Sequence, residues 1–267
     1  MTNKDNRPIA FFDSGVGGLT VFSKVKKLLP NENYLYFGDT KNMPYGEKTE
    51  DELICFADRI FRFFEEQNAK AVVMACNTSS AVTYEKLKNN YNFKIYPIIQ
   101  SVCESLANLD GVKNLGIIAT PATINSHAYS KGVKKYNSDM NIFELAAPEW
   151  VRIVEEHRIN APQSQSQIKN ILNIMAENQP DKIVLACTHY PYLLDVLKKY
   201  MPAEIFIDPS VFFAQNIKKD LTKNGLLGDK FEYEKFFVSS NPENFKVASE
   251  LFYKLDKLPE LTSLVVN

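Results

Sequence analysis

Short apolar runs alternate with amphipathic stretches along this chain of 267 residues, and this alternation constrains the fold most strongly. In the first part, strands are predicted at 8–12, 34–37, 71–75 and 94–97, with helices at 17–29, 49–67 and 78–90. Thr49 and Glu52 form a T-x-x-E capping box at the start of the second helix. Alternating strands and helices are typical of parallel sheets that helices cover on both faces. The sequence therefore predicts an α/β protein with mostly parallel sheets.

The same order of elements repeats further along the chain. Strands are predicted at 115–119, 142–145, 183–186 and 204–207, each displaced from its counterpart by roughly 110 positions. Any alternating α/β chain shows some regularity, but here a cysteine falls at the same point of the same strand in both parts. We therefore predict two related halves in tandem.

The remainder of the chain adds a helix, a strand at 235–240 and a last helix that begins at Asn241 and Pro242. We expect this C-terminal part to pack back onto the first half. The predicted domains are 1–98 plus 209–267, which carries Cys76, and 99–208, which carries Cys187.

Charge and cysteine usage narrow the classes of function. The formal net charge is −1, so no overall basic field requires nucleic acid as a partner. No apolar run approaches the roughly 20 residues that span a bilayer, and the polar N-terminus does not resemble a signal peptide. The four cysteines form no CxxC pair, which argues against structural zinc, and no metal ligand set is predicted. We expect a cytoplasmic protein that does not bind a membrane.

Polar residues directly follow the predicted strands, where parallel sheets bind their ligands. Those of the first half are Asp13, Ser14, Pro44, Tyr45, Gly46, Cys76, Asn77 and Thr78. Those of the second half are Thr120, Glu155, Glu156, Cys187, Thr188 and His189. If the two halves face each other, all these groups surround one cleft.

Cys76 ends the run KAVVMAC, and Cys187 ends the run KIVLAC. A thiol at the N-terminus of a helix has a lowered pKa, because the helix dipole stabilises the thiolate. Two acid–base groups on opposite sides of one carbon atom suit stereoinversion, in which one removes a proton and the other delivers one. Buried cysteine is often inert, and Cys55 and Cys103, in predicted apolar helical surroundings, keep that interpretation.

The stretch DSGVGGLT, residues 13 to 20, follows the first strand and is rich in glycine. It lacks the Gly-Lys-Ser/Thr of a P-loop and the third glycine of a dinucleotide fingerprint, so we predict a tight turn. Asp13 can cap the next helix or take part in chemistry. His189 lies two residues from Cys187 and is a candidate to assist it, whereas His127 and His157 are expected on the surface.

Four motifs in this order, FFDSGVGGLTV, YFGDTKNMPYGEKT, ACNTSSA and ACTHYP, resemble those of the glutamate racemase family. That family belongs to the cofactor-independent aspartate/glutamate racemases, and the match extends from about residue 9 to residue 191. The resemblance implies two flavodoxin-like domains related by a pseudo-twofold axis, with the active site between them.

The resemblance also implies roles for individual residues. Cys76 and Cys187 correspond to the two proton donors and acceptors, which Asp13, His189 and a glutamate of the segment VEEH assist. We choose Glu155 over Glu156, although His157 stands where the family usually has glycine. The substrate-binding residues implied are Asp13, Ser14, Pro44, Tyr45, Gly46, Asn77, Thr78, Thr120, Thr188 and His189.

The activity that the resemblance implies is interconversion of L-glutamate and D-glutamate, which supplies D-glutamate for peptidoglycan. No cofactor is implied, and a homodimer is the usual assembly. Two alternatives stay open at this point. One is a relative that acts on aspartate, hydantoins or malonates, and the other is a non-catalytic protein that binds an amino acid or a partner protein.

Overall fold

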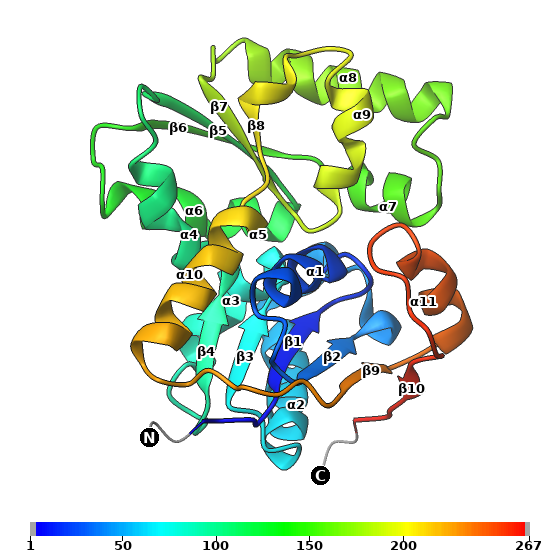
Figure 1. The fold of residues 1–267 in the computed structure, drawn as a ribbon. Helices are drawn as coiled ribbons and strands as arrows, with labels where there is room; N and C mark the ends of the chain where they lie inside the picture. The colour runs from blue at the N-terminus through cyan, green and yellow to red at the C-terminus, as the bar shows by residue number, and fades with distance from the viewer. Residues whose placement is uncertain (1–3, 265–267) are drawn as a thin grey trace.

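The computed structural model describes residues 4–264, which form two parallel β-sheets with helices packed around and between them (Figure 1). The first sheet has six strands in the order β10-β9-β2-β1-β3-β4, and the second has four in the order β6-β5-β7-β8. Every strand pair in both sheets is parallel, as the alternation of elements predicts.

The elements follow one another along the chain in three groups. The first group is β1 (Ile9–Asp13), α1 (Leu19–Leu28), β2 (Tyr34–Gly38), α2 (Glu50–Glu66), β3 (Ala71–Met74), α3 (Asn77–Leu87), β4 (Lys94–Pro97) and α4 (Ile98–Ala107). The second is β5 (Asn114–Ala119), α5 (Pro121–Ser126), α6 (Ala128–Lys134), β6 (Asn141–Ala146), α7 (Glu149–Glu155), α8 (Pro162–Ala176), β7 (Lys182–Ala186), α9 (Leu194–Leu197) and β8 (Phe206–Ile207). The third is α10 (Ser210–Lys223), β9 (Glu234–Val238), α11 (Pro242–Ser249) and β10 (Glu260–Leu261).

The repeat seen in the sequence is matched by the topology. The strands β2-β1-β3-β4 and β6-β5-β7-β8 have the same spatial order, so each strand of the first group has a counterpart in the second. The C-terminal strands β9 and β10 extend the first sheet at the edge formed by β2. The boundaries 1–98 plus 209–267 and 99–208 remain our proposal for the domain division.

Local sequence signals place several elements correctly. Both hydrogen bonds of the capping box at Thr49 are present, and α11 begins at Pro242 after Asn241. One expectation about a helix is wrong. The chain after Cys187 forms a short 3₁₀ turn, Tyr190–Leu193, and then the four-residue α9, so no long helix begins at this cysteine.

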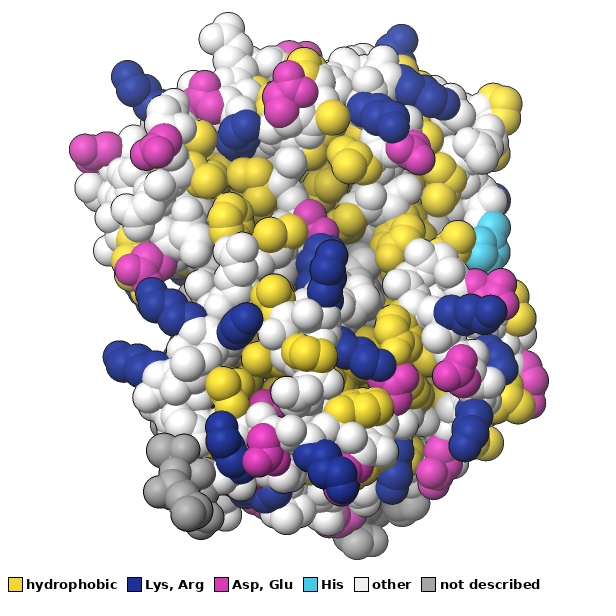
Figure 2. Space-filling view, in the orientation of Figure 1, with side chains coloured by type: hydrophobic (Ala, Val, Ile, Leu, Met, Phe, Trp, Pro, Cys, Tyr) yellow, Lys and Arg dark blue, Asp and Glu magenta, His cyan; other side chains and the backbone are white. Residues whose placement is uncertain are grey.

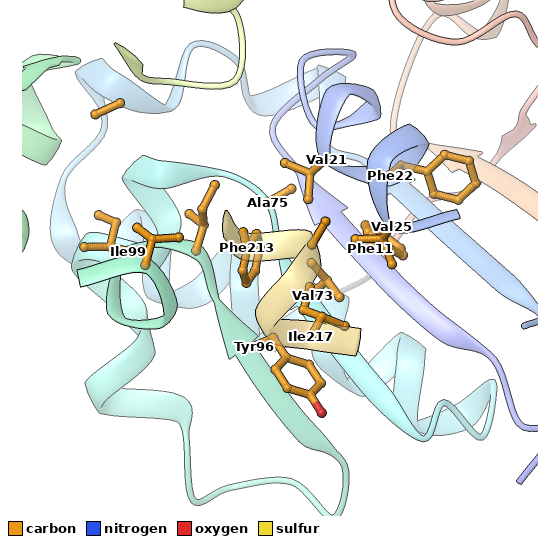
Figure 3. Close-up of a cluster of buried hydrophobic side chains, with 14 of the residues drawn as sticks. Phe11, Val21, Phe22, Val25, Val73, Ala75, Tyr96, Ile99, Phe213 and Ile217 are labelled. Atoms are coloured by element: carbon orange, nitrogen blue, oxygen red, sulfur yellow. The ribbon is translucent and has the colours of Figure 1, made fainter. Parts of the chain in front are cut away.

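The helices α4 and α10 tie the two halves together. Helix α10 follows the last strand of the second sheet but packs against α1, while α4 follows the last strand of the first sheet and packs against α6. Phe213 and Ile217 of α10 lie against the first sheet near Val73 (Figure 3). The same cluster of buried side chains continues to Ile117 of the second sheet. One hydrophobic core therefore spans both halves.

Two further clusters cover the outer faces of the sheets. Phe61 and Phe64 of α2 pack on the first sheet, and Trp150 of α7 and Ile168 of α8 pack on the second. Outside these clusters, basic and acidic side chains are mixed over the visible face, without a field of one sign (Figure 2). Within residues 4–264, no helix is both long enough and apolar enough to cross a bilayer.

The core that joins the halves predicts the effect of truncating Phe213. Phe213→Ala should lower the free energy of unfolding by about 3 to 5 kcal/mol, because it removes a fully buried ring and leaves a cavity. Val211→Ala on the same helix is the control, since Val211 is 45% exposed and its truncation should cost less than about 0.5 kcal/mol. Urea unfolding measures both, and equal effects would contradict the role assigned to α10.

Candidate active site

A cavity lies where the carboxyl ends of the two sheets meet, and it encloses about 570 Å³, including the part open to solvent. Both Cys76 and Cys187 line it. So do nine of the ten residues expected to bind substrate, namely Ser14, Pro44, Tyr45, Gly46, Asn77, Thr78, Thr120, Thr188 and His189. The fold thus gathers around one cavity residues that are up to 175 positions apart in the chain.

Cys76 is the N-cap residue of α3, and its side chain lines the cavity although the residue is only 6% exposed. Burial raises the pKa of the Cys76 thiol well above its usual range, and the nearby Asp13 carboxylate raises it further. Hydrogen bonds from the backbone N–H of Ser79 and the hydroxyl of Ser14 oppose this shift without overcoming it. The expectation that the helix N-terminus lowers this pKa is therefore wrong for the empty cavity, because burial has the larger effect.

Cys187 follows β7 and is 8% exposed. The Nδ1 atom of His189 lies 3.8 Å from its sulfur, so the predicted pairing of thiol and imidazole is present. The backbone carbonyl of Cys187 accepts a hydrogen bond from the N–H of Tyr190, which folds the chain into a tight turn. This turn returns the His189 ring to the thiol.

The other ring nitrogen of His189 contacts Glu155, with 2.5 Å between Nε2 and Oε1. Burial alone would lower the pKa of His189, but hydrogen bonds to Cys187 and Glu155 outweigh it and raise the pKa well above its usual range. Glu156 points elsewhere and pairs with Arg158 at 2.6 Å. Of the two candidate glutamates, Glu155 is thus the one that reaches the site, from behind His189.

Asp13 is completely buried and does not line the cavity. Its Oδ1 accepts a hydrogen bond from the N–H of Gly15 at 3.0 Å, and its Oδ2 accepts one from the Thr188 hydroxyl at 3.4 Å. Burial raises the pKa of Asp13 to about 6, with the charge of His189 acting in the opposite direction. Asp13 is therefore placed to influence the site through its charge and through Thr188.

The glycine-rich turn has a steric reason. A side chain at Gly17 would collide with the Thr188 hydroxyl and the His189 ring. The turn therefore lets the first half approach the ACTHYP segment of the second half closely. This agrees with the prediction of a tight turn rather than a phosphate loop.

Hydroxyl groups from both halves meet at the opposite wall of the cavity. The Oγ1 atoms of Thr78 and Thr120 are 2.8 Å apart, and Thr123 lies 3.0 Å from Thr120. The wall formed by Tyr45 is also fixed, since its hydroxyl donates to buried Asp39 at 2.6 Å. The cavity thus presents several positioned hydroxyl groups to a ligand.

Six residues that the sequence analysis did not single out also line the cavity, namely Met43, Glu47, Pro121, Pro148, Val151 and Arg152. Arg152 of α7 and Glu47 of the segment after β2 form an ion pair of 2.5 Å between the two halves. Both side chains are about half exposed, so this pair lies at the mouth of the cavity. A sequence separation of 105 residues gave no signal of it.

Three residues outside the cavity complete the comparison with expectation. Cys103 is buried as expected, but Cys55 is exposed on α2, with Arg59 donating to its sulfur at 3.0 Å, so its predicted apolar surroundings are wrong. His127 is on the surface but has a partner, Glu144, at 2.7 Å. Residues 4–264 contain no group of three or more His, Cys, Asp or Glu side chains arranged to hold a metal ion.

Helix α7 ends in an unusual way. The N–H groups of His157 and Arg158 bond back to the carbonyls of Val154 and Ile153, which is the Schellman pattern of helix termination. This pattern needs a left-handed residue, and His157 supplies it with φ of 54°. The exposed histidine thus adopts the conformation that glycine would adopt without strain, and the orientation of α7 is kept.

Comparison with known proteins agrees with this geometry. The sequence profile of the family described as Asp/Glu/hydantoin racemase matches residues 17–215. A glutamate racemase of Thermoanaerobacter pseudethanolicus is 38% identical over 249 residues, covering 92% of this chain and 93% of the relative. One from Carboxydothermus hydrogenoformans is 33% identical and covers 99% of both chains.

Solved structures give the same answer for the fold. The crystal structure of glutamate racemase from Francisella tularensis in complex with D-glutamate superposes with a TM-score of 0.89. It is 31% identical to this chain and covers 97% of it, and the match spans 98% of the solved chain. The protein belongs to the Asp/Glu/hydantoin racemase family and is an isomerase of the racemase type.

The buried carboxyl of Asp13 predicts a pH-dependent stability. Its pKa is about 6 in the folded protein and about 3.8 when exposed, so the folded state binds the proton more tightly. The stability that it contributes is full below about pH 4 and is lost as the pH rises through 6, by about 3 kcal/mol in total. Asp13→Asn should remove this loss. The two free energies of unfolding, measured in urea at pH 4, 5 and 7, should therefore diverge as the pH rises, and a constant difference would contradict the shift.

The strained end of α7 predicts a stabilising substitution. His157→Gly should raise the free energy of unfolding by up to about 1 kcal/mol, because glycine adopts positive φ without a steric cost. Helix α10 offers the matched control: Gly225 ends it in the same pattern with φ of 64°, and a Cβ there would meet no other atom. Gly225→Ala should lower the free energy of unfolding by a similar amount. Urea denaturation tests both, and destabilisation by His157→Gly would contradict the assignment.

Proposed function

We propose that this protein interconverts L-glutamate and D-glutamate without a cofactor, using Cys76 and Cys187 as two opposed acid–base groups. The observation that carries the proposal is that these thiols, each at the end of an equivalent strand in its half, line one cavity. The relatives named glutamate racemase, which match nearly the whole chain, support glutamate as the substrate.

The proposed reaction moves two protons. The thiolate of one cysteine takes the α-proton and becomes a thiol, which leaves a carbanion at the α-carbon. The thiol of the other cysteine then donates its proton to the opposite face and becomes a thiolate. By analogy with the family, Cys76 handles the α-proton of D-glutamate and Cys187 that of L-glutamate.

Each thiol has a proposed assistant. His189 exchanges a proton with Cys187 across 3.8 Å, and Glu155 stabilises the imidazolium that results. Asp13, whose pKa is about 6, accepts the proton of Cys76 when that residue must become a thiolate. The raised pKa of the Cys76 thiol supports this need for an acceptor, since an empty site holds the residue protonated.

The substrate is held by hydrogen-bond donors around the cavity. We assign this role to Ser14, Asn77, Thr78, Thr120 and Thr188, which all line it. Pro44, Tyr45 and Gly46 form the facing wall. Donors aimed at the α-carboxylate stabilise the charge that develops when the α-proton leaves, and this is the largest demand on such a site.

The wider role that we propose is supply of D-glutamate for peptidoglycan by a cytoplasmic homodimer. The names of the relatives support this role as far as the reaction. A substrate panel of glutamate, aspartate and a hydantoin separates the proposal from the activities that the broader family name covers.

Proton NMR in D₂O tests the reaction directly. Each enantiomer of glutamate, incubated with the protein and no added cofactor, should lose its α-proton signal and its optical rotation. Cys76→Ala and Cys187→Ala should each slow racemisation in both directions by at least about 100-fold. Cys55→Ser, which changes an exposed thiol, is the control and should have no effect.

Two results would overturn parts of the proposal. Near-normal racemisation by folded Cys76→Ala would exclude the two-thiol route. Binding of glutamate by the unaltered protein without α-proton exchange from either enantiomer would favour a non-catalytic binding protein.

A further inference from the structure

The side-chain amide of Asn77 has two different ends in the empty cavity. Its Oδ1 accepts a hydrogen bond of 2.7 Å from the hydroxyl of Tyr129. Its Nδ2 is buried and has no hydrogen-bond partner, although Asn77 lines the cavity. A buried donor without a partner costs free energy, so a ligand atom that accepts from it recovers that cost.

Tyr129 determines which end of the amide faces the cavity. The tyrosine is completely buried, and burial raises the pKa of Tyr129 well above its usual range, so its hydroxyl keeps its proton. Among the hydrogen bonds of residues 4–264, Asn77 Oδ1 is the acceptor for this proton. If the amide turned over, the hydroxyl proton would lose its acceptor and an oxygen would face the substrate.

The two residues belong to opposite halves of the molecule. Asn77 is the first residue of α3, which follows Cys76, and Tyr129 lies in α6 of the second half. Helix α6 is held against α4, one of the two helices that cross between the halves. The ring of Tyr129 is therefore fixed by the core that joins the halves.

We infer that Tyr129 is a positioning residue for substrate binding, which locks the Asn77 amide with its N–H₂ group toward the cavity as a donor to a substrate carboxylate. This inference rests on the proposed function, because it takes an amino-acid carboxylate as the acceptor. An oxygen in the same place would repel that carboxylate, so the lock selects the attractive orientation of a group that could otherwise present either end.

Tyr129→Phe removes the lock and leaves the ring in place. We expect kcat/KM for L-glutamate to fall roughly three- to tenfold, the loss expected for one hydrogen bond that fixes an orientation. Tyr34→Phe is the matched control: Tyr34 is also fully buried, its hydroxyl donates to the backbone carbonyl of Leu29 at 2.6 Å, and it does not line the cavity. Tyr34→Phe should leave kcat/KM unchanged when both variants are folded.

A double-mutant cycle separates positioning from a general structural effect. In an Asn77→Ala background, Tyr129→Phe should have no further effect on kcat/KM, because the group it positions is gone. Additive losses in the cycle, or a Tyr129→Phe variant as active as the unaltered protein, would overturn the inference while leaving the racemase intact. Absence of racemisation by the unaltered protein would instead reject the proposed function.

Discussion

The apolar faces of α4 and α10 hold the two halves of this protein in one arrangement, and the site depends on it. Each helix continues from one sheet and packs on a helix of the other half, so a single hydrophobic core runs through both. This packing presents the carboxyl ends of the two parallel sheets to each other. Groups that follow β1, β3, β5 and β7 then surround one cavity, and hydrogen bonds such as Thr188 to Asp13 and Tyr129 to Asn77 cross the boundary between the halves.

Burial controls the chemistry of the groups that this packing brings together. At Cys76, the removal of water outweighs the N–H groups of the helix start, so the pKa of the thiol is raised. At His189, two hydrogen bonds to neighbouring acidic groups outweigh burial, so the pKa of the imidazole is also raised. The same low-dielectric surroundings thus hold one group neutral and another charged, and the difference lies in the partners each group has.

Much of the fold could be predicted because its signals are local. Apolar runs and the capping box at Thr49 mark the elements, and the equivalent strand ends identify Cys76 and Cys187. The crossing of α4 and α10 could not be predicted, since periodicity shows which face of a helix is apolar but not which sheet that face covers. The raised pKa of Cys76 and the pair formed by Arg152 and Glu47 depend on groups distant in the chain. Sequence spacing carries no information about them.

The ion pair of Arg152 and Glu47 has a consequence for traffic into the cavity. The two side chains come from opposite halves and are 46% and 54% exposed, so solvent screens their attraction. A pair this exposed contributes at most about 1 kcal/mol, which leaves roughly one molecule in six with the pair broken at any moment. The cavity mouth therefore opens without any rearrangement of the shared core. Dissolved salt increases the open fraction, because it weakens exposed ion pairs far more than buried ones.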